Sequence, residues 1–113
     1  MDTPQNPSSI IKVGPVSIDT DPMRREVSVA GKRTPRLTPT EFKTLHFLVM
    51  NANEVCTTDQ ITSHVFGPNF DEGTLVKAHI RHIRYKIEPD PNEPIYLLTV
   101  PGVGYKLVVP DGD

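Results

Sequence analysis

The sequence has few of the features that mark secreted, membrane-spanning or disulfide-linked proteins. Its single cysteine, Cys56, cannot form an internal disulfide, so we expect a protein of the reducing cytoplasm. The longest apolar runs, FLVM and IYLLTV, fall far short of the roughly 20 residues that cross a bilayer. The start, MDTPQNPSS, has no basic and apolar regions of a signal peptide. We therefore expect no membrane association.

Patterns that would support catalysis, metal binding or RNA binding are also missing. No Ser–His–Asp or Cys–His arrangement is evident, which makes an enzyme a weak hypothesis. The histidines and Cys56 lack the spacing of metal ligands, so we expect neither a metal nor another cofactor. Four Phe and three Tyr residues, most at core-periodic positions, leave few aromatic rings for stacking on RNA bases.

What the sequence does contain is an uneven distribution of charge. The chain has 12 Lys and Arg against 14 Asp and Glu, yet residues 74–87 hold four cations and no acid. At about 100° per residue, one side of this segment is apolar, with small Ala78 near the middle of the other. The apolar positions are Val76, Ile80, Ile83 and Ile87, and the cations are Lys77, Arg81, Arg84 and Lys86.

This pattern predicts a helix that buries one face and presents a cationic face, which suits the major groove of DNA. The alternative is a solvated surface that is basic by chance. The absence of Glu–Lys pairs four residues apart, which solvated helices commonly use, disfavours that alternative.

The segments around the basic helix predict a small α+β domain. Residues 10–37 read as short antiparallel strands, with Pro35 marking an edge strand. Two capping boxes, Thr38 with Glu41 and Thr57 with Gln60, predict two helices before the basic one. IYLLTV, PGVG and YKLVV then read as a β-hairpin. In this hairpin Tyr105 either packs on the core or, with Lys106, donates to phosphates.

Taken together, these elements predict a winged helix-turn-helix: an N-terminal antiparallel β-sheet, a three-helix core and a C-terminal β-hairpin wing. We expect the domain to span residues 10–109, with tails at 1–9 and 110–113.

Three stretches in this order resemble the OmpR/PhoB-type effector domain of bacterial response regulators. They are RLTPTEFKTLHFLV, VKAHIRHIRYKIEPD and YLLTVPGVGYKL, and the likeness covers about residues 10–109. The resemblance implies a recognition helix at 74–87 and a wing at 95–109. The DNA-binding residues it implies are Thr74, Lys77, Arg81, His82 and Arg84 on the helix, and Tyr105 and Lys106 on the wing. It also implies a polymerase-contact loop of Gly67, Pro68, Asn69, Phe70, Asp71, Glu72 and Gly73.

The sequence departs from the family pattern at three positions. Pro101 stands where the wing commonly carries an arginine, and Lys77 stands where an acid is common. Phe66 takes a place often held by tryptophan. The departures at Pro101 and Lys77 bear on the DNA sequence that is preferred and leave the fold unaffected.

The resemblance also implies partners and a biological role. It implies sequence-specific binding of double-stranded DNA for transcription regulation in a two-component phosphorelay. Two copies would occupy direct-repeat half-sites about one helical turn apart, with RNA polymerase as a further partner. The family's receiver domain is absent from these residues, so the chain is either an excised effector domain, which we favour, or a stand-alone regulator. An alternative function is a protein–protein module whose DNA binding is weakened at the wing.

Overall fold

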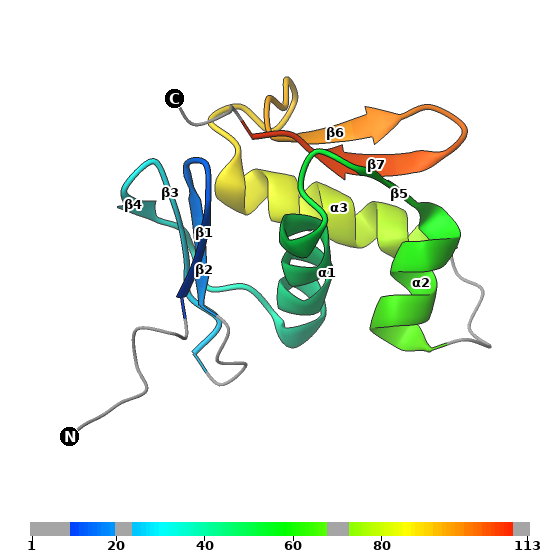
Figure 1. Cartoon of the computed structure of the whole chain (residues 1–113), viewed down its shortest axis with the longest axis horizontal. Helices are drawn as coiled ribbons and strands as arrows, with labels where there is room; N and C mark the ends of the chain where they lie inside the picture. The colour runs from blue at the N-terminus through cyan, green and yellow to red at the C-terminus, as the bar shows by residue number, and fades with distance from the viewer. Residues whose placement is uncertain (1–9, 20–23, 68–72, 110–113) are drawn as a thin grey trace.

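The computed structural model describes residues 10–19, 24–67 and 73–109, so the predicted tails at 1–9 and 110–113 lie outside it. Within these residues, three helices pack against two antiparallel sheets, the N-terminal sheet at the left of Figure 1 and the C-terminal sheet along its top. The predicted α+β architecture is confirmed. The helices are α1 (Pro39–Met50), α2 (Thr58–Phe66) and α3 (Gly73–Ile87). The strands are β1 (Ile10–Val13), β2 (Val16–Asp19), β3 (Val27–Val29), β4 (Lys32–Arg33), β5 (Val55–Thr57), β6 (Leu97–Val100) and β7 (Gly104–Leu107).

The N-terminal sheet has the order β1-β2-β3-β4 and packs its central strands on the core. Val16 opposes Val29, and Ile18 opposes Val27, and all four side chains are buried. β4 ends at Arg33, before Pro35, so the predicted edge strand is shorter than the sequence suggested. Proline has no N–H to donate to a strand partner, which explains the early end.

Both predicted capping boxes are present, and they fix where α1 and α2 begin. The N–H of Glu41 donates to Thr38 Oγ1 at 3.2 Å, and the N–H of Thr38 donates to Glu41 Oε1 at 3.0 Å. Thr57 and Gln60 exchange the equivalent bonds at 3.0 and 2.8 Å. These bonds satisfy N–H groups that have no partner within the first helical turn.

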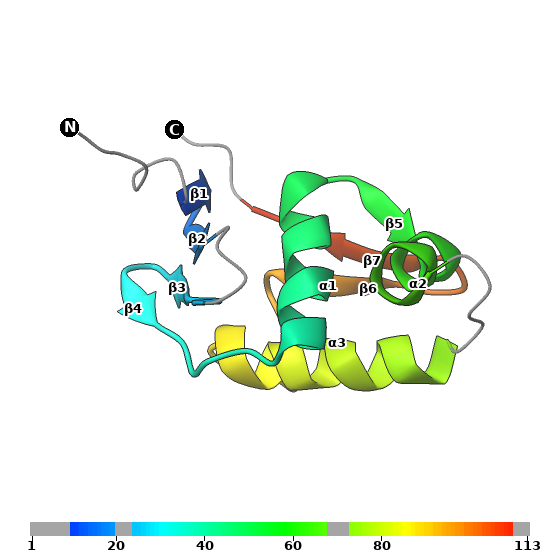
Figure 2. The same ribbon diagram turned by 90° about the horizontal axis from the view of Figure 1, so that it is seen from below.

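The apolar stripe of α3 is buried as predicted. The exposed fractions of Val76, Ile80, Ile83 and Ile87 lie between 0% and 4%. The stripe packs against α1, whose buried side chains include Leu45 and Leu48. In Figure 2, α3 forms one edge of the molecule, with α1 and the hairpin strands on its inner side. The opposite side of α3 is therefore the side that a partner can reach.

The predicted hairpin of β6 and β7 is confirmed, and β5 extends it into a sheet of order β5-β7-β6. The pairing of β5 with β7 was not predicted from the sequence. Gly104 makes this pairing feasible, because a Cβ atom there would lie 2.7 Å from Thr57 Cα and would overlap the Cys56 carbonyl. Only glycine allows the two backbones to approach so closely.

A buried glutamate joins the end of α3 to the start of β6. The Glu88 carboxylate accepts hydrogen bonds from the N–H groups of Ile95, Tyr96 and Leu97 at 2.8, 3.0 and 2.7 Å. It therefore holds the wing at a defined position relative to α3.

Among the described residues, no helix combines the length and apolar character needed to cross a membrane.

Candidate nucleic-acid interface

The outward face of α3 carries two cations that the protein itself does not neutralise. Lys77 and Arg81 are exposed, and within the part of the chain that the structure describes neither has an ion pair or a hydrogen-bond partner. An exposed lysine or arginine without a carboxylate partner keeps its full charge available to phosphates or guanine edges.

Arg84, in contrast, is held in place by the wing. Its Nε donates to the carbonyl oxygen of Leu97 at 2.9 Å, and its Nη2 donates to Thr99 Oγ1 at 2.9 Å. Its guanidinium also lies 6.0 Å from the centre of the Tyr105 ring. All three partners belong to the hairpin and none is a carboxylate, so Arg84 ties α3 to β6 while retaining its positive charge.

Lys86 is neutralised from a neighbouring helix. Its Nζ donates to Glu41 Oε1 at 2.7 Å and to the carbonyl oxygen of Arg36 at 2.9 Å. Burial raises the pKa of Glu41, but the hydrogen bonds from Lys86 and from the Thr38 N–H outweigh it and hold the pKa below its ordinary value. The acid that α3 lacks is thus supplied by α1, and Lys86 does not contribute to the free positive charge of the outward face.

His82 leans toward the same carboxylate. Its Nδ1 lies 3.6 Å from Glu41 Oε2, while 56% of the side chain stays exposed. His82 is therefore accessible on the flank of α3, and its contact with DNA stays a prediction. When the imidazole is protonated, part of its charge is countered by Glu41.

The two predicted wing residues lie on opposite faces of the β5-β7-β6 sheet. Tyr105 is only 7% exposed and packs in the core beside Arg84, which matches the first of its two predicted alternatives. Lys106 is the next residue in β7, opposite Val55 and Leu98, and side chains alternate along a strand. Lys106 therefore lies on the face of the sheet that points away from Lys77 and Arg81, and its contact with DNA stays a prediction.

Two hollows flank Lys77 between α3 and the wing. One, of about 350 Å³, is lined by Lys77, Arg81 and Arg84 from α3, and by Thr99 and Tyr105 from the hairpin. The other, of about 460 Å³, lies between Lys77, the start of α2 and the hairpin loop that contains Gly102. The positive charge of α3 thus borders a concave surface that the wing completes.

Two histidines pack against aromatic rings of neighbouring helices. His79 lies 5.8 Å from the Phe66 ring, and His64 lies 4.4 Å from the Phe47 ring. Burial lowers the pKa of His79, whose buried Nδ1 has no hydrogen-bond partner. His79 is therefore a packed side chain whose burial favours the neutral imidazole. The described residues contain no group of three His, Cys, Asp or Glu side chains that could hold a metal ion.

Part of the predicted interface lies outside the described residues. Gly73 and Thr74 belong to the first turn of α3, but the Thr74 side chain is not among those described. The predicted polymerase-contact loop also falls largely outside, since Pro68 to Glu72 are not described. Gly67 is described and forms the C-cap of α2 with a φ of 106°.

A basic helix preceded by a short helix and followed by a hairpin that contacts it defines the chain as a winged helix-turn-helix domain. The sequence matches the family model described as transcriptional regulatory protein, C terminal, over residues 32–107. The chain belongs to this family.

Curated and structurally solved relatives agree with this assignment. The sensory transduction protein RegX3 of Mycobacterium tuberculosis is 40% identical over 100 residues, which cover 87% of this chain and 42% of RegX3. The response regulator DrrB of Thermotoga maritima, an OmpR/PhoB homologue, superposes with a TM-score of 0.74 at 33% identity, covering 88% of this chain and 44% of DrrB. The Klebsiella pneumoniae RstA DNA-binding domain, solved in complex with the RstA box, gives 0.71 at 25% identity, covering 88% and 96%. The chain thus spans less than half of RegX3 and of DrrB.

Proposed function

We propose that the chain binds double-stranded DNA sequence-specifically and regulates transcription as the effector domain of a two-component response regulator. The observation that carries the proposal is the pair of exposed, unpaired cations, Lys77 and Arg81, on the uncovered face of α3. When cationic side chains neutralise DNA phosphates, the counterions condensed on the DNA are released, and this release favours binding. Family membership and the DNA complex of the RstA domain support the same function.

In this proposal α3 lies in the major groove and the hairpin is the wing. Arg81 and His82 meet base edges, while Lys77 and Arg84 meet phosphates or nearby bases. Thr74, Tyr105 and Lys106 contact phosphates, Tyr105 through its hydroxyl group, since its ring is in the core. Lys106 would have to approach the backbone from the far face of the sheet, which makes it the weakest of these contacts.

The arrangement of the whole regulator is part of the same proposal. Residues 10–109 act as one DNA-binding unit, with 1–9 and 110–113 as tails. Two copies bind direct-repeat half-sites in tandem, and a receiver domain controls their pairing through local concentration. RNA polymerase contacts the loop at 67–73. The protein acts in the cytoplasm and catalyses no reaction.

Selection from random duplexes tests DNA binding and separates it from the second candidate, a protein–protein module. Pro101, in place of the usual wing arginine, favours the module. The expected result is one enriched motif, bound with an affinity that falls steeply as salt concentration rises. The absence of any duplex binding at low salt would contradict the proposal and favour the module.

A further inference from the structure

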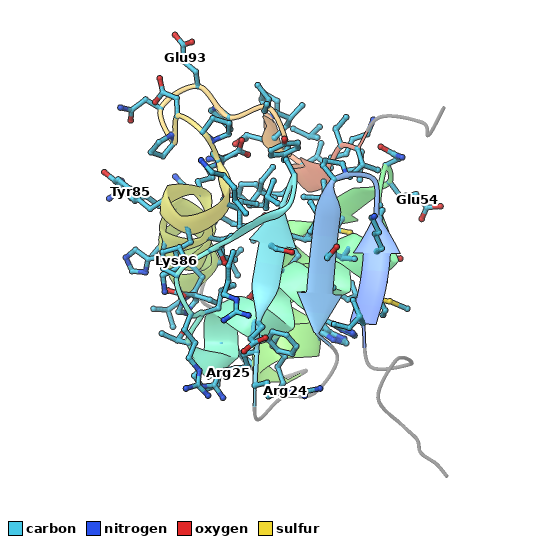
Figure 3. All side chains as sticks on the ribbon, turned by 90° about the vertical axis from the view of Figure 1, so that its left-hand side faces the viewer. Arg24, Arg25, Glu54, Tyr85, Lys86 and Glu93 are labelled. Atoms are coloured by element: carbon cyan, nitrogen blue, oxygen red, sulfur yellow. The ribbon has the colours of Figure 1, made fainter. Side chains whose placement is uncertain are left out.

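The centre of the exposed face of α3 is apolar, although its flanks are cationic. Tyr85 is 65% exposed and Leu75 is 37% exposed, and Ala78 lies between them along the helix. Around the helix, Leu75 projects about 60° from Ala78, on the flank that carries His82. At 100° per residue, Ala78 and Tyr85 project within about 20° of each other and away from the buried stripe. Figure 3 shows Tyr85 extending outward from α3. We call Leu75, Ala78 and Tyr85 the apolar strip.

The cations lie beside this strip. Lys77 and Arg84 lie on the flank that faces the hairpin, since both line the hollow between α3 and Thr99. On the other flank Lys86 is bound to Glu41. When the centre of this exposed face enters the major groove first, the apolar strip faces the base edges at the floor of the groove. Lys77 then faces the phosphate backbone along one side.

An exposed apolar side chain is common on protein surfaces and needs no function of its own. The strip differs from that background in two ways. Tyr85 has the largest exposed fraction of the large hydrophobic side chains that the structure describes. It also shares one face of one helix with Leu75 and Ala78, next to the unpaired Lys77 and Arg81.

We infer that the apolar strip recognises thymine, through contact with the C5-methyl groups that thymine exposes in the major groove. This inference rests on the proposed function. Of the four bases, only thymine presents a methyl group there, and alanine and aromatic side chains are its usual partners. From Leu75 to Tyr85 the helix rises about 15 Å, at 1.5 Å per residue. With about 3.4 Å per base pair along the DNA axis, a helix parallel to that axis would take the strip past about four base pairs, and an inclined helix past fewer. The half-site therefore contains thymines within a run of at most about that length.

Deoxyuridine substitution tests the inference directly, because deoxyuridine pairs as thymine does and lacks only the methyl group. Each thymine of a selected duplex is replaced in turn, and Kd is measured for the wild-type chain. The expected result is a weakening of about fourfold at one or more positions, the factor that corresponds to one buried methyl group.

Variants then show whether the strip senses those methyl groups. Leu75→Ala and Tyr85→Ala should each lose the sensitivity to deoxyuridine at one position and keep it at the others. Met50→Ala is the matched control, because Met50 is 58% exposed on α1, away from the outward face of α3. This variant should keep the complete wild-type pattern.

Three results would overturn the inference, and they are distinguishable. Specific binding without any deoxyuridine effect would remove thymine recognition and leave the proposed function intact. Deoxyuridine effects that persist unchanged in both strip variants would show that other residues sense the methyl groups. Failure of every duplex to bind at low salt would overturn the proposed function and the inference together.

Discussion

Replacing Arg84 and Arg81 separately by methionine tests the different roles that the structure gives to two arginines on one helix. Arg84 donates two hydrogen bonds to β6, whereas Arg81 has no partner among the described residues. Hydrogen bonds that involve a charged group contribute about 1.5–3 kcal/mol each, and less where solvent competes. The bond to Leu97 is half-buried and the bond to Thr99 is exposed, so Arg84→Met should lower the free energy of unfolding by about 2 kcal/mol.

The assay is denaturant unfolding together with the midpoint temperature. For a domain of about 100 residues, a loss of this size lowers the midpoint by roughly 10 °C. Arg81→Met is the control, because an exposed side chain without partners should change stability by no more than about 0.5 kcal/mol. Equal stability of the two variants, or a larger loss for Arg81→Met, would refute the reasoning that Arg84 braces the wing.

Three further predictions concern acid stability, strand packing and the wing. The pKa of Glu41 is lower in the folded chain than in the unfolded one, so its contribution to stability is present above the unfolded pKa and is lost as pH falls through the folded pKa. Glu41→Gln should therefore reduce the loss of unfolding free energy on the acid side, and a pH profile of stability identical to that of the wild type would contradict this. Gly104→Ala should destabilise the chain by about 1–3 kcal/mol through the clash with β5, and wild-type stability would refute the packing argument. Pro101→Arg should strengthen duplex binding and raise its salt dependence, whereas an unchanged slope would show that the wing tip does not approach DNA.

The features that the sequence predicted correctly are those encoded within a few residues. The capping boxes at Thr38 and Thr57 join groups three residues apart, and the buried stripe of α3 follows from helical periodicity. Such patterns depend on local geometry alone, so they survive in any tertiary context.

The features that it missed depend on contacts between distant segments. Lys86 meets Glu41 across 45 residues, and Arg84 meets Leu97 and Thr99 only because the hairpin folds back on α3. Glu41 was recognisable from sequence only as a capping residue. The side of the sheet that Lys106 occupies could have been inferred, because it is fixed by alternation once Tyr105 is known to point inward.

The central claim is that the outward face of α3, together with the wing, forms the DNA-binding surface. Mapping the chemical-shift changes of backbone amides during titration with a selected duplex tests it most directly. We predict that the largest changes fall on residues 74–87 and on the hairpin, while the β1-β2-β3-β4 sheet changes little. Changes concentrated on that N-terminal sheet, with the amides of α3 unaffected, would contradict the account.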